Sequence, residues 1–471
     1  MLEIPDAHVV RHLRAENVWW QAPHRVASDV DRLSPRAYLS PFLSLVTTHG
    51  VRRAVVLLGP RRVGKTVLIR HAIRALLDQG VPPDRLCYVS VDHPIYTGRS
   101  LHALVDFYKA TRDTARSAPG PTYVFFDEIQ YLRDWEVHLK ALVDEYPDMR
   151  FVASGSAAAA LRLKSRESGA GRFTDFLLPA LTFHEFLDLT GESALVEPDD
   201  AGHWPYVPDL TALNARFVEY LNVGGYPEVA LNPLVQADPG RYVKADIIDK
   251  VLLRDLPGLY GIQDVQELNA LFATLAYNTA AEVSLDELAT RSGVAKDTLK
   301  RYIEYLEAAF LIRIVHRVDR SAHRFQRAVR FKVYLTSPSM RAALFTPVAA
   351  DDEAIGHLAE TAVFSHWLHD APPLHYARWR SGEVDLVALG RDQRVAWALE
   401  VKWSDRVLGR PAELGALVRF CREQRLERAW VTTRTVAGET VIGGVRIRLV
   451  PTAVYCYHVG RGLVSGQLTL D

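Results

Sequence analysis

Residues 59–66 constrain the fold of this chain more than any other segment, because they read Gly-Pro-Arg-Arg-Val-Gly-Lys-Thr. This fits the phosphate-binding loop pattern, in which Gly and four further residues precede Gly-Lys-Thr. An apolar run at 54–58 precedes the segment, and a helical pattern at 67–73 follows it. A strand, a tight loop and a helix together point backbone N–H groups and the helix N-terminus at an anion. The sequence therefore predicts a parallel α/β sheet that binds a nucleoside triphosphate at this loop.

The residues of the loop have separate expected roles. Lys65 would reach the β- and γ-phosphates, and Thr66 would hold Mg²⁺. ATP and Mg²⁺ are therefore the expected cofactors. The predicted nucleotide-binding residues are Gly59, Pro60, Arg61, Arg62, Val63, Gly64, Lys65, Thr66 and Val67.

A second predicted strand, at 122–127, ends in two acids, Asp127 and Glu128. An apolar run of this kind indicates a buried parallel strand that carries its last residues to the carboxyl edge of the sheet. Ligands of open α/β sheets bind at that edge. Asp127 would bind Mg²⁺, directly or through water, and Glu128 would act as general base on the attacking water. The alternative is that the two acids only cap a helix.

A further strand at 150–156 ends in small polar residues that could lie beside the γ-phosphate. Ser154 is the candidate γ-phosphate sensor, and Ser156 is the alternative. Either serine could instead cap a helix that begins at Ala157. Arg172 is the arginine of this half best suited to reach a phosphate, in its own subunit or in a neighbour's. The alternative for Arg172 is an ordinary surface arginine.

The middle of the chain has the pattern of a helix-turn-helix. A short helix at 284–292 ends at Gly293, and a second helix starts near Ala295. A strand at 310–315 would form a wing. Between residues 291 and 332, eleven basic residues stand against four acidic ones. This favours contact with phosphate backbones, although winged helices in ATPases also serve as lids or protein joints.

The last third contains a second group of candidate site residues. Asp385 lies on a predicted strand, and Glu400 and Lys402 lie two residues apart on the return strand, so they face the same side. The carboxylates can hold a divalent metal, Mg²⁺ or Mn²⁺, and the lysine can steady the attacking water or the developing charge. Glu360, on a predicted helix at 355–368, adds an upstream acid. This is the Asp…Glu-x-Lys arrangement of restriction-endonuclease-like folds; the alternative is an ion-pair cluster in a scaffold that has lost catalysis.

These segments together resemble a prokaryotic AAA-type ATPase family in which the ATPase is fused to a long C-terminal region of unknown function. The resemblance rests on the phosphate loop, on Phe-Phe-Asp-Glu-Ile-Gln at 125–130, on Ala-Ser-Gly-Ser at 153–156, on Gly171-Arg172, and on Leu-Pro-Ala-Leu-Thr-Phe-His-Glu-Phe at 178–186. It covers about residues 35–460. Family members usually carry Thr-Gly-Ser where this chain has Ser-Gly-Ser, a change that keeps a hydroxyl. The resemblance implies ATP hydrolysis and, because AAA-type domains often form rings, a homo-oligomer; a monomeric switch remains open.

The chain has 471 residues, which is too long for a single core. We expect a multidomain α/β protein with a P-loop NTPase parallel sheet, a helical and winged-helix middle, and a restriction-endonuclease-like α/β domain at the end. The predicted parts are an N-terminal extension (1–45), the AAA-type ATPase domain (46–190), a helical lid or linker (191–265), a winged helix (266–318) and a nuclease-like domain (319–471).

Composition adds few constraints. The net charge is zero, so only local patches can favour nucleic acid. The three cysteines are far apart and form no disulfide framework or zinc pattern, which suits a reducing cytoplasm. No apolar run is long enough to span a bilayer. We therefore expect a cytoplasmic, bacterial protein without a membrane partner.

The leading functional hypothesis is an ATP-driven or ATP-gated protein that acts on nucleic acid, with nuclease activity if the C-terminal acids are active. One rival is a conformational switch whose C-terminal domain only binds a partner. Another rival is a DNA-binding regulator that acts through its winged helix.

Overall fold

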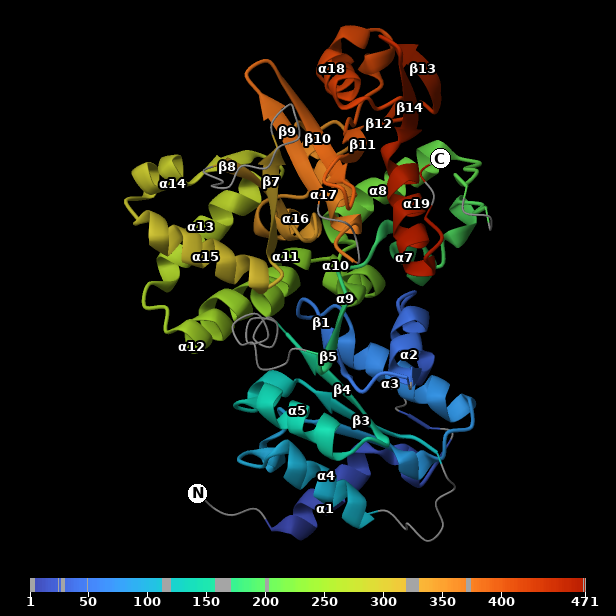
Figure 1. Cartoon of the computed structure of the whole chain (residues 1–471), viewed down its shortest axis with the longest axis vertical. Coiled ribbons are helices and arrows are strands. Elements are labelled where there is room, and N and C mark those ends of the chain that lie inside the picture. Colours follow the sequence, from blue (N-terminus) through green and yellow to red (C-terminus); the bar gives the residue numbers. More distant parts are fainter. Residues whose placement is uncertain are drawn as a thin grey trace. The chain divides into compact units, whose positions relative to one another are not determined.

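The computed structural model describes residues 5–23, 25–26, 30–48, 50–111, 120–156, 171–199, 203–318, 330–369, 374–468 and 470. The chain divides into two compact units, Met1–Leu178 and Pro179–Asp471. Each unit is built on a sheet of its own (Figure 1).

The first unit contains a sheet of five parallel strands in the order β2-β3-β4-β1-β5. The first four strands along the chain are almost wholly buried, as expected for a parallel sheet covered on both faces. Leu58 pairs with Gly155 and Ser90 pairs with Asp127, so the carboxyl ends of these strands meet at one edge. The strands are β1 (Ala54–Leu58), β2 (Leu86–Ser90), β3 (Thr122–Asp127), β4 (Met149–Gly155) and β5 (Phe173–Leu177).

Helices flank this sheet on both sides (Figure 1). Helix α2 packs beside α3, and α4 packs beside α5 and α1. The helices are α1 (Asp6–Glu16), α2 (Leu39–Thr47), α3 (Lys65–Asp78), α4 (Leu101–Thr111) and α5 (Trp135–Glu145), with short 3₁₀ turns at Val18–Trp20, Val30–Arg32, Pro83–Arg85, Pro94–Tyr96 and Ile129–Tyr131.

The N-terminal segment, predicted as an extension, is an integral part of the first unit because it closes the free edge of β2. The side chain of Asn17 is fully buried; its amide donates to the Tyr88 carbonyl at 2.8 Å and accepts from the Tyr88 N–H at 2.7 Å. The indole N–H groups of Trp19 and Trp20 both donate to the Leu86 carbonyl, at 3.0 and 2.8 Å. Unpaired edge strands invite pairing with other chains. These side chains therefore provide hydrogen-bond partners for the backbone of β2 that a sixth strand would otherwise provide.

We expect Asn17→Ala to destabilise the edge of β2. The substitution removes both hydrogen bonds to Tyr88 and leaves buried backbone groups without partners, which costs about 1–3 kcal/mol. Hydrogen exchange of the Tyr88 amide measures this loss directly. Gln21→Ala is the matched control, because Gln21 carries an exposed amide in the same segment. Equal protection of Tyr88 in the two variants would contradict the role given to Asn17.

The second unit contains a sheet of nine strands in the order β13-β14-β12-β11-β10-β9-β7-β8-β6. The pairs β7–β9, β11–β12 and β12–β14 are parallel, and the others are antiparallel. The strands are β6 (Glu282–Ser284), β7 (Ile312–Val318), β8 (Arg330–Leu335), β9 (Leu374–Trp379), β10 (Gly382–Leu389), β11 (Val395–Glu400), β12 (Arg428–Thr433), β13 (Gly438–Ile442) and β14 (Val445–Pro451).

The helices of the second unit surround this sheet and pack among themselves (Figure 1). They are α7 (Phe183–Leu189), α8 (Leu210–Val223), α9 (Pro227–Leu231), α10 (Pro233–Gln236), α11 (Pro239–Tyr242), α12 (Leu256–Tyr260), α13 (Val265–Tyr277), α14 (Leu285–Ser292), α15 (Lys296–Ala308), α16 (Ser339–Leu344), α17 (Ile355–His366), α18 (Gly415–Gln424) and α19 (Thr452–Ser465). Val243–Asp249 and Val251–Asp255 are π-helical. Within the described ranges, no helix is long and apolar enough to cross a membrane.

The predicted helix-turn-helix corresponds to α14 and α15, with Gly293 in a left-handed conformation (φ +73°) between them. The predicted wing, however, does not form a separate module with them. Strand β7 pairs with β8 on one side and with β9 on the other. Its residues Ile312, Val315 and Val318 are buried, so this strand belongs to the interior of the sheet. Strands on both sides of the predicted boundary at 318/319 belong to one sheet.

Candidate functional site

The phosphate-binding loop lies between the end of β1 and the start of α3, as predicted. Gly64 precedes the helix with φ +92°, a left-handed conformation that favours glycine. At Gly59, an added Cβ would collide with the carbonyl of Leu178. Both glycines are therefore required by the backbone, and Pro60, Arg61, Arg62 and Val63 form the turn between them. Val67 follows in the first turn of α3.

Lys65 is buried at the base of this loop. Its ammonium donates to the carbonyls of Gly59 and Pro60 at 3.1 and 2.8 Å. Burial lowers the pKa of Lys65, and the charges of Glu128 and Asp127 act in the opposite direction. The acids at the end of β3 are thus close enough to influence the loop lysine.

Asp127 is the centre of the hydrogen-bond network at the carboxyl edge of the sheet. It is only 1% exposed. Its Oδ2 accepts from the Thr66 hydroxyl at 2.7 Å and from the Tyr88 hydroxyl at 2.8 Å. Its Oδ1 accepts from the Ser154 hydroxyl and, at 3.2 Å, from the Glu128 N–H. The structure thus brings together the two residues predicted to hold Mg²⁺ and the predicted sensor.

Glu128 follows in a left-handed conformation, with φ +56° and ψ +44°. Such a backbone is uncommon for a residue with a side chain. Its N–H also lies 3.2 Å from the Ser154 Oγ, and its carboxylate accepts from the Gln130 amide. The side-chain oxygen Oε1 of Gln130 accepts from the Ser156 N–H at 3.2 Å. Gln130 therefore connects the predicted general base to Ser156, the alternative sensor, by a backbone contact.

Arg172 is not brought to this site. It directly precedes β5, and its carbonyl accepts from the Ala54 N–H at 2.9 Å, at the start of β1. The phosphate loop follows the other end of β1, about 13 Å away at 3.3 Å per residue. The Arg172 guanidinium instead pairs with Asp144 at 2.6 Å. Within its own subunit, Arg172 therefore lies at the edge of the sheet opposite the phosphate loop.

Two residues near the loop were missed by the sequence reasoning. The buried Arg36 donates to the Val63 carbonyl at 3.0 Å and so fixes the loop from the N-terminal segment. The Tyr88 hydroxyl, on β2, donates to Asp127. Burial, and after it the charge of Asp127, raises the pKa of this hydroxyl. Neither residue belongs to a local motif, so only the three-dimensional arrangement could identify them.

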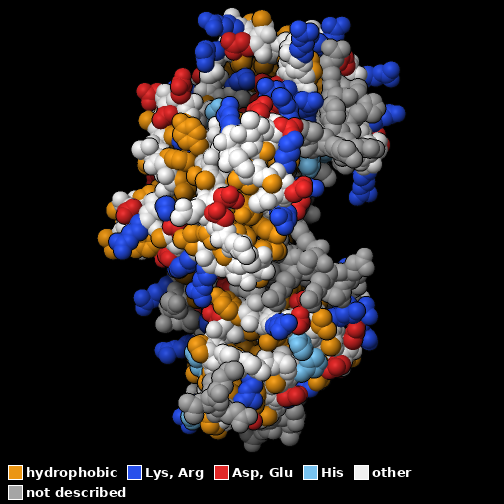
Figure 2. Space-filling model, turned by 90° about the vertical axis from the view of Figure 1, so that its left-hand side faces the viewer, with side chains coloured by type: hydrophobic (Ala, Val, Ile, Leu, Met, Phe, Trp, Pro, Cys, Tyr) orange, Lys and Arg blue, Asp and Glu red, His pale blue; other side chains and the backbone are white. Residues whose placement is uncertain are grey.

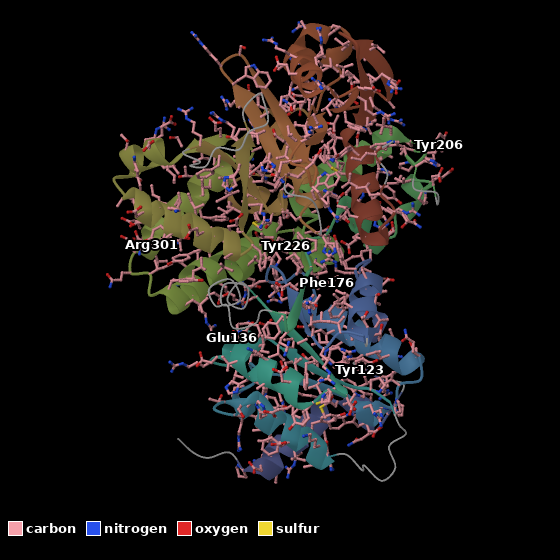
Figure 3. The ribbon with its side chains drawn as sticks, in the orientation of Figure 1. Tyr123, Glu136, Phe176, Tyr206, Tyr226 and Arg301 are labelled. Atoms are coloured by element: carbon pink, nitrogen blue, oxygen red, sulfur yellow. The ribbon has the colours of Figure 1, made fainter. Side chains whose placement is uncertain are left out.

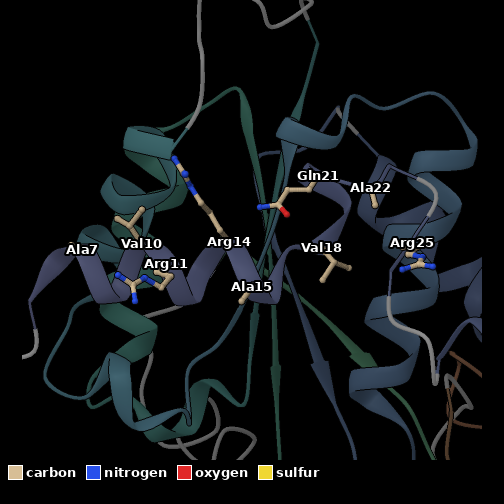
Figure 4. Close-up of a pocket in the computed structure, with 9 residues that line it drawn as sticks. All are labelled: Ala7, Val10, Arg11, Arg14, Ala15, Val18, Gln21, Ala22 and Arg25. Atoms are coloured by element: carbon tan, nitrogen blue, oxygen red, sulfur yellow. The ribbon is translucent and has the colours of Figure 1, made fainter.

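A groove of about 860 Å³ runs along α1 and the turn after it (Figure 4). Arg11, Arg14 and Arg25 line it, together with small and apolar side chains such as Val10 and Val18. None of the predicted nucleotide-binding residues lines this groove.

The four residues predicted in the last third meet in one buried cluster of the second unit. Asp385 on β10 stands across from Glu400 on β11, because Leu386 pairs with Leu399 in the antiparallel register. The Asp385 Oδ2 accepts from the Val401 N–H at 2.9 Å. Lys402 and Glu400 face the same side, with 2.7 Å between Nζ and Oε1. Glu360 arrives from α17, as expected.

A fifth residue, Lys332 on β8, joins this cluster without having been predicted. Its Nζ lies 2.8 Å from Glu360 Oε1, 2.7 Å from Glu383 Oε1 and 3.3 Å from Asp385 Oδ1. Tyr334, two residues along β8, also donates to Glu360 Oε1, at 2.6 Å. The sequence signal for Lys332 is a lysine between two apolar residues of β8, Phe331 and Val333.

The charges of the cluster are strongly coupled. Burial, followed by the charge of Asp385, raises the pKa of Glu360 to about 7 and that of Glu400 to about 8. Burial also acts to raise the pKa of Asp385, but Lys332 and Lys402 outweigh it and hold this pKa below its usual value. For Lys332, the surrounding carboxylates outweigh burial and raise its pKa well above the usual range. Lys332 is therefore a permanent cation at neutral pH.

The exposed face of α14 and α15 contains some of the predicted basic residues. Arg291, Lys300 and Arg301 are exposed, and Figure 3 shows Arg301 at the outer margin of these helices. Lys296 pairs with Asp286. Figure 2 views the chain from this side, and Lys and Arg are scattered among acidic and neutral side chains there. Arg320, Arg324 and Arg327 of the counted segment lie outside the described residues.

Comparison with known families matches two parts of the chain. Residues 51–187 match the family model described as an AAA domain. Residues 214–351 match a model described as a domain of unknown function, DUF8612. The first match contains the whole phosphate-loop network from Gly59 to Ser156.

Two uncharacterized proteins are similar to much of the chain. One, from Haemophilus influenzae, is 22% identical over 371 residues, which is 77% of this chain and 85% of that protein. The other, from Methanocaldococcus jannaschii, is 24% identical over 331 residues, which is 66% of this chain and 67% of that protein.

Among solved structures, the Aeropyrum pernix ORC1 protein in complex with DNA matches 68% of this chain and 94% of its own, with 16% identity and a TM-score of 0.29. The Saccharomyces cerevisiae Hsp104:casein complex matches 61% of this chain and 53% of its own, with 14% identity and a TM-score of 0.30. Similarities this weak carry no argument about the fold. The family match and the loop geometry together identify residues 51–187 as an AAA-type domain of the ATP-binding P-loop class.

Proposed function

We propose that the first unit hydrolyses ATP with Mg²⁺, and that this hydrolysis drives or gates an action of the chain on nucleic acid. The observation that carries the ATPase part is the network around Asp127. Its carboxylate contacts the Thr66 hydroxyl at 2.7 Å, directly after the phosphate loop, and Glu128 is the next residue. A hydroxyl and a carboxylate are the oxygen ligands that Mg²⁺ takes in P-loop proteins.

In this mechanism, the loop N–H groups and Lys65 would hold the phosphates, and Thr66 and Asp127 would hold the metal. Bound Mg²⁺ would neutralise charge on the β- and γ-phosphate oxygens. Glu128 would accept a proton from the attacking water. The Gln130 amide donates to the Glu128 carboxylate and orients it. The Ser154 hydroxyl donates to Asp127 and accepts from the Glu128 N–H. These contacts fix the metal ligand and the base relative to each other.

The nucleic-acid part of the proposal rests on the exposed basic residues Arg291, Lys300 and Arg301 of the helix-turn-helix. Contacts of Lys and Arg with phosphates release counterions, so such binding weakens steeply as salt concentration rises. A nucleic-acid-driven ATPase is expected to hydrolyse ATP faster when its polymer is present.

The test is phosphate release by the full-length protein with ATP and Mg²⁺, alone and with plasmid, single-stranded DNA or RNA. We expect turnover that Lys65→Ala abolishes and that one polymer stimulates in a salt-dependent manner. Turnover without stimulation by any polymer would favour the conformational switch. Salt-dependent DNA binding without turnover would favour the DNA-binding regulator. Turnover retained by Lys65→Ala would overturn the assignment of the site.

A second candidate function, metal-dependent cleavage of nucleic acid, would require a divalent metal to displace Lys332 from the acids of the second unit. Glu360, Asp385, Glu400 and Lys402 come from separate segments and meet in one cluster. Incubation of the same substrates with Mg²⁺ or Mn²⁺ tests this candidate, beside a Lys402→Ala variant. Cleavage that the variant loses would establish it.

A further inference from the structure

The acidic cluster of the second unit has the donor chemistry of a divalent-metal site but not its arrangement. Carboxylate oxygens are suitable ligands for Mg²⁺ or Mn²⁺. Nevertheless, among the residues that the structure describes, no group of three or more His, Cys, Asp or Glu side chains is placed so that it could hold a metal ion. The position of Lys332 explains this disagreement.

The Lys332 ammonium lies among the carboxylates that a metal would need. It has three N–H donors, and three carboxylates surround it, those of Glu360, Glu383 and Asp385, at 2.7 to 3.3 Å. All of its donors can thus be satisfied. Its side chain is 3% exposed, so water cannot replace these partners.

The remaining oxygens of the cluster are also largely engaged. Tyr334 donates to the Glu360 oxygen that Lys332 binds, and the Val401 N–H takes the second oxygen of Asp385. Two oxygens are exceptions among the described residues: Glu400 Oε2, which is buried, and Glu360 Oε2, because both donors to Glu360 contact its other oxygen. Both oxygens of Asp385 are engaged, so the three carboxylates do not each keep a free oxygen for one divalent cation. A metal ion would also need oxygens at about 2.0–2.1 Å for Mg²⁺, and the ammonium stands between the acids that would supply them.

We infer that Lys332 is the resident cation of this cluster and that it excludes divalent metal from Glu360 and Asp385. The cluster is then a latent metal site, and Lys332 is the residue that keeps it latent. Lys402, the lysine of the Asp…Glu-x-Lys pattern, does not have this role, because among the described residues it pairs with Glu400 alone and its side chain is 32% exposed.

Mn²⁺ binding to the full-length protein, measured without nucleotide by electron paramagnetic resonance, tests the inference. The proteins are wild type, Lys332→Met, and each of these combined with Asp385→Asn. Only Mn²⁺ that Asp385→Asn releases is counted, so any binding near the phosphate loop cancels. We expect no such site in wild type and one per chain in Lys332→Met. We also expect Mn²⁺ to raise the melting temperature of Lys332→Met but not that of wild type.

Two outcomes would overturn the inference. One is an Asp385-dependent Mn²⁺ site in wild type, and the other is the lack of such a site in folded Lys332→Met. If Lys332→Met folds poorly without metal, Lys332→Gln provides a polar replacement. Both variants are then purified in Mn²⁺, and the retained metal is measured by elemental analysis. ATP hydrolysis is measured on the same samples and does not depend on this result, so failure of the ATPase proposal would be seen separately.

Discussion

Glu128→Gln is expected to retain ATP binding and to lower kcat for ATP hydrolysis by about 10²- to 10⁴-fold, the usual contribution of a general base. The amide keeps the size of the side chain and its polar contact with Gln130, but it cannot take a proton from water. Asp127 and Thr66 are untouched, so the expected Mg²⁺ ligands remain. Single-turnover phosphate release, with a separate measurement of nucleotide affinity, distinguishes the two effects.

Two further variants serve as controls for Glu128→Gln. Lys65→Ala should weaken nucleotide binding as well as turnover, because it removes a cation from the phosphates. Arg172→Ala should change neither in a monomer, since this arginine pairs with Asp144 at the far edge of the sheet. If Glu128→Gln turned over like wild type, the base would have to be sought elsewhere, and the hydrolysis mechanism proposed here would be wrong. A strong defect in Arg172→Ala would instead indicate that a neighbouring subunit completes the site.

The phosphate loop could be predicted from sequence because its chemistry depends on consecutive residues. Gly59, Gly64, Lys65 and Thr66 are specified by the backbone path between one strand and one helix. Asp127 was predictable for a related reason: a buried parallel strand ends at the carboxyl edge whatever its neighbours are. For such residues, the local sequence pattern is enough to predict the position in the folded domain.

Other features depend on contacts between distant segments, and no local pattern records them. Asn17 reads as an ordinary polar residue at the end of a helix, yet it hydrogen-bonds to Tyr88, 71 positions away. Arg172 was drawn to the site by its position in a motif, whereas the direction of β5 carries it to the opposite edge. The position of Asn17 depends on which strand lies at the edge of the sheet, and that of Arg172 depends on the direction of β5. Local sequence reveals neither.

The charge balance of the acidic cluster also depends on a contact between distant segments. Asp385, Glu400 and Lys402 could be placed on facing strands from their spacing alone, and the structure brings them together. The partner that neutralises Asp385 comes instead from β8, 53 positions earlier in the chain. A motif that lists only its own residues therefore overestimates how much free negative charge remains for a metal.

Lys332→Met is accordingly expected to destabilise the second unit by about 3–5 kcal/mol in the absence of divalent metal, the usual cost of removing one partner from a buried ion pair. Lys402→Met is the matched control, with a smaller expected cost than Lys332→Met, because the Lys402 side chain is 32% exposed and pairs with one carboxylate, that of Glu400, among the described residues. Hydrogen exchange of amides in β8, β10 and β11 reports the stability of this unit separately from that of the first.

The loss of stability in Lys332→Met is also expected to depend on pH. Without Lys332, Glu360 and Glu400 lose a cation that favours their charged form, so their folded-state pKa values rise further above the unfolded values. The pKa of Asp385, which the lysines hold below its usual value, also rises. In the native protein, the pKa values of Glu360 and Glu400 are already about 7 and about 8. The folded variant then binds more protons than the unfolded chain, and its stability falls as pH rises. The deficit of Lys332→Met relative to wild type should therefore grow as pH rises from 5 and be largest above pH 8. A deficit that does not change with pH, or an equal one in Lys402→Met, would show that Lys332 contributes packing rather than charge.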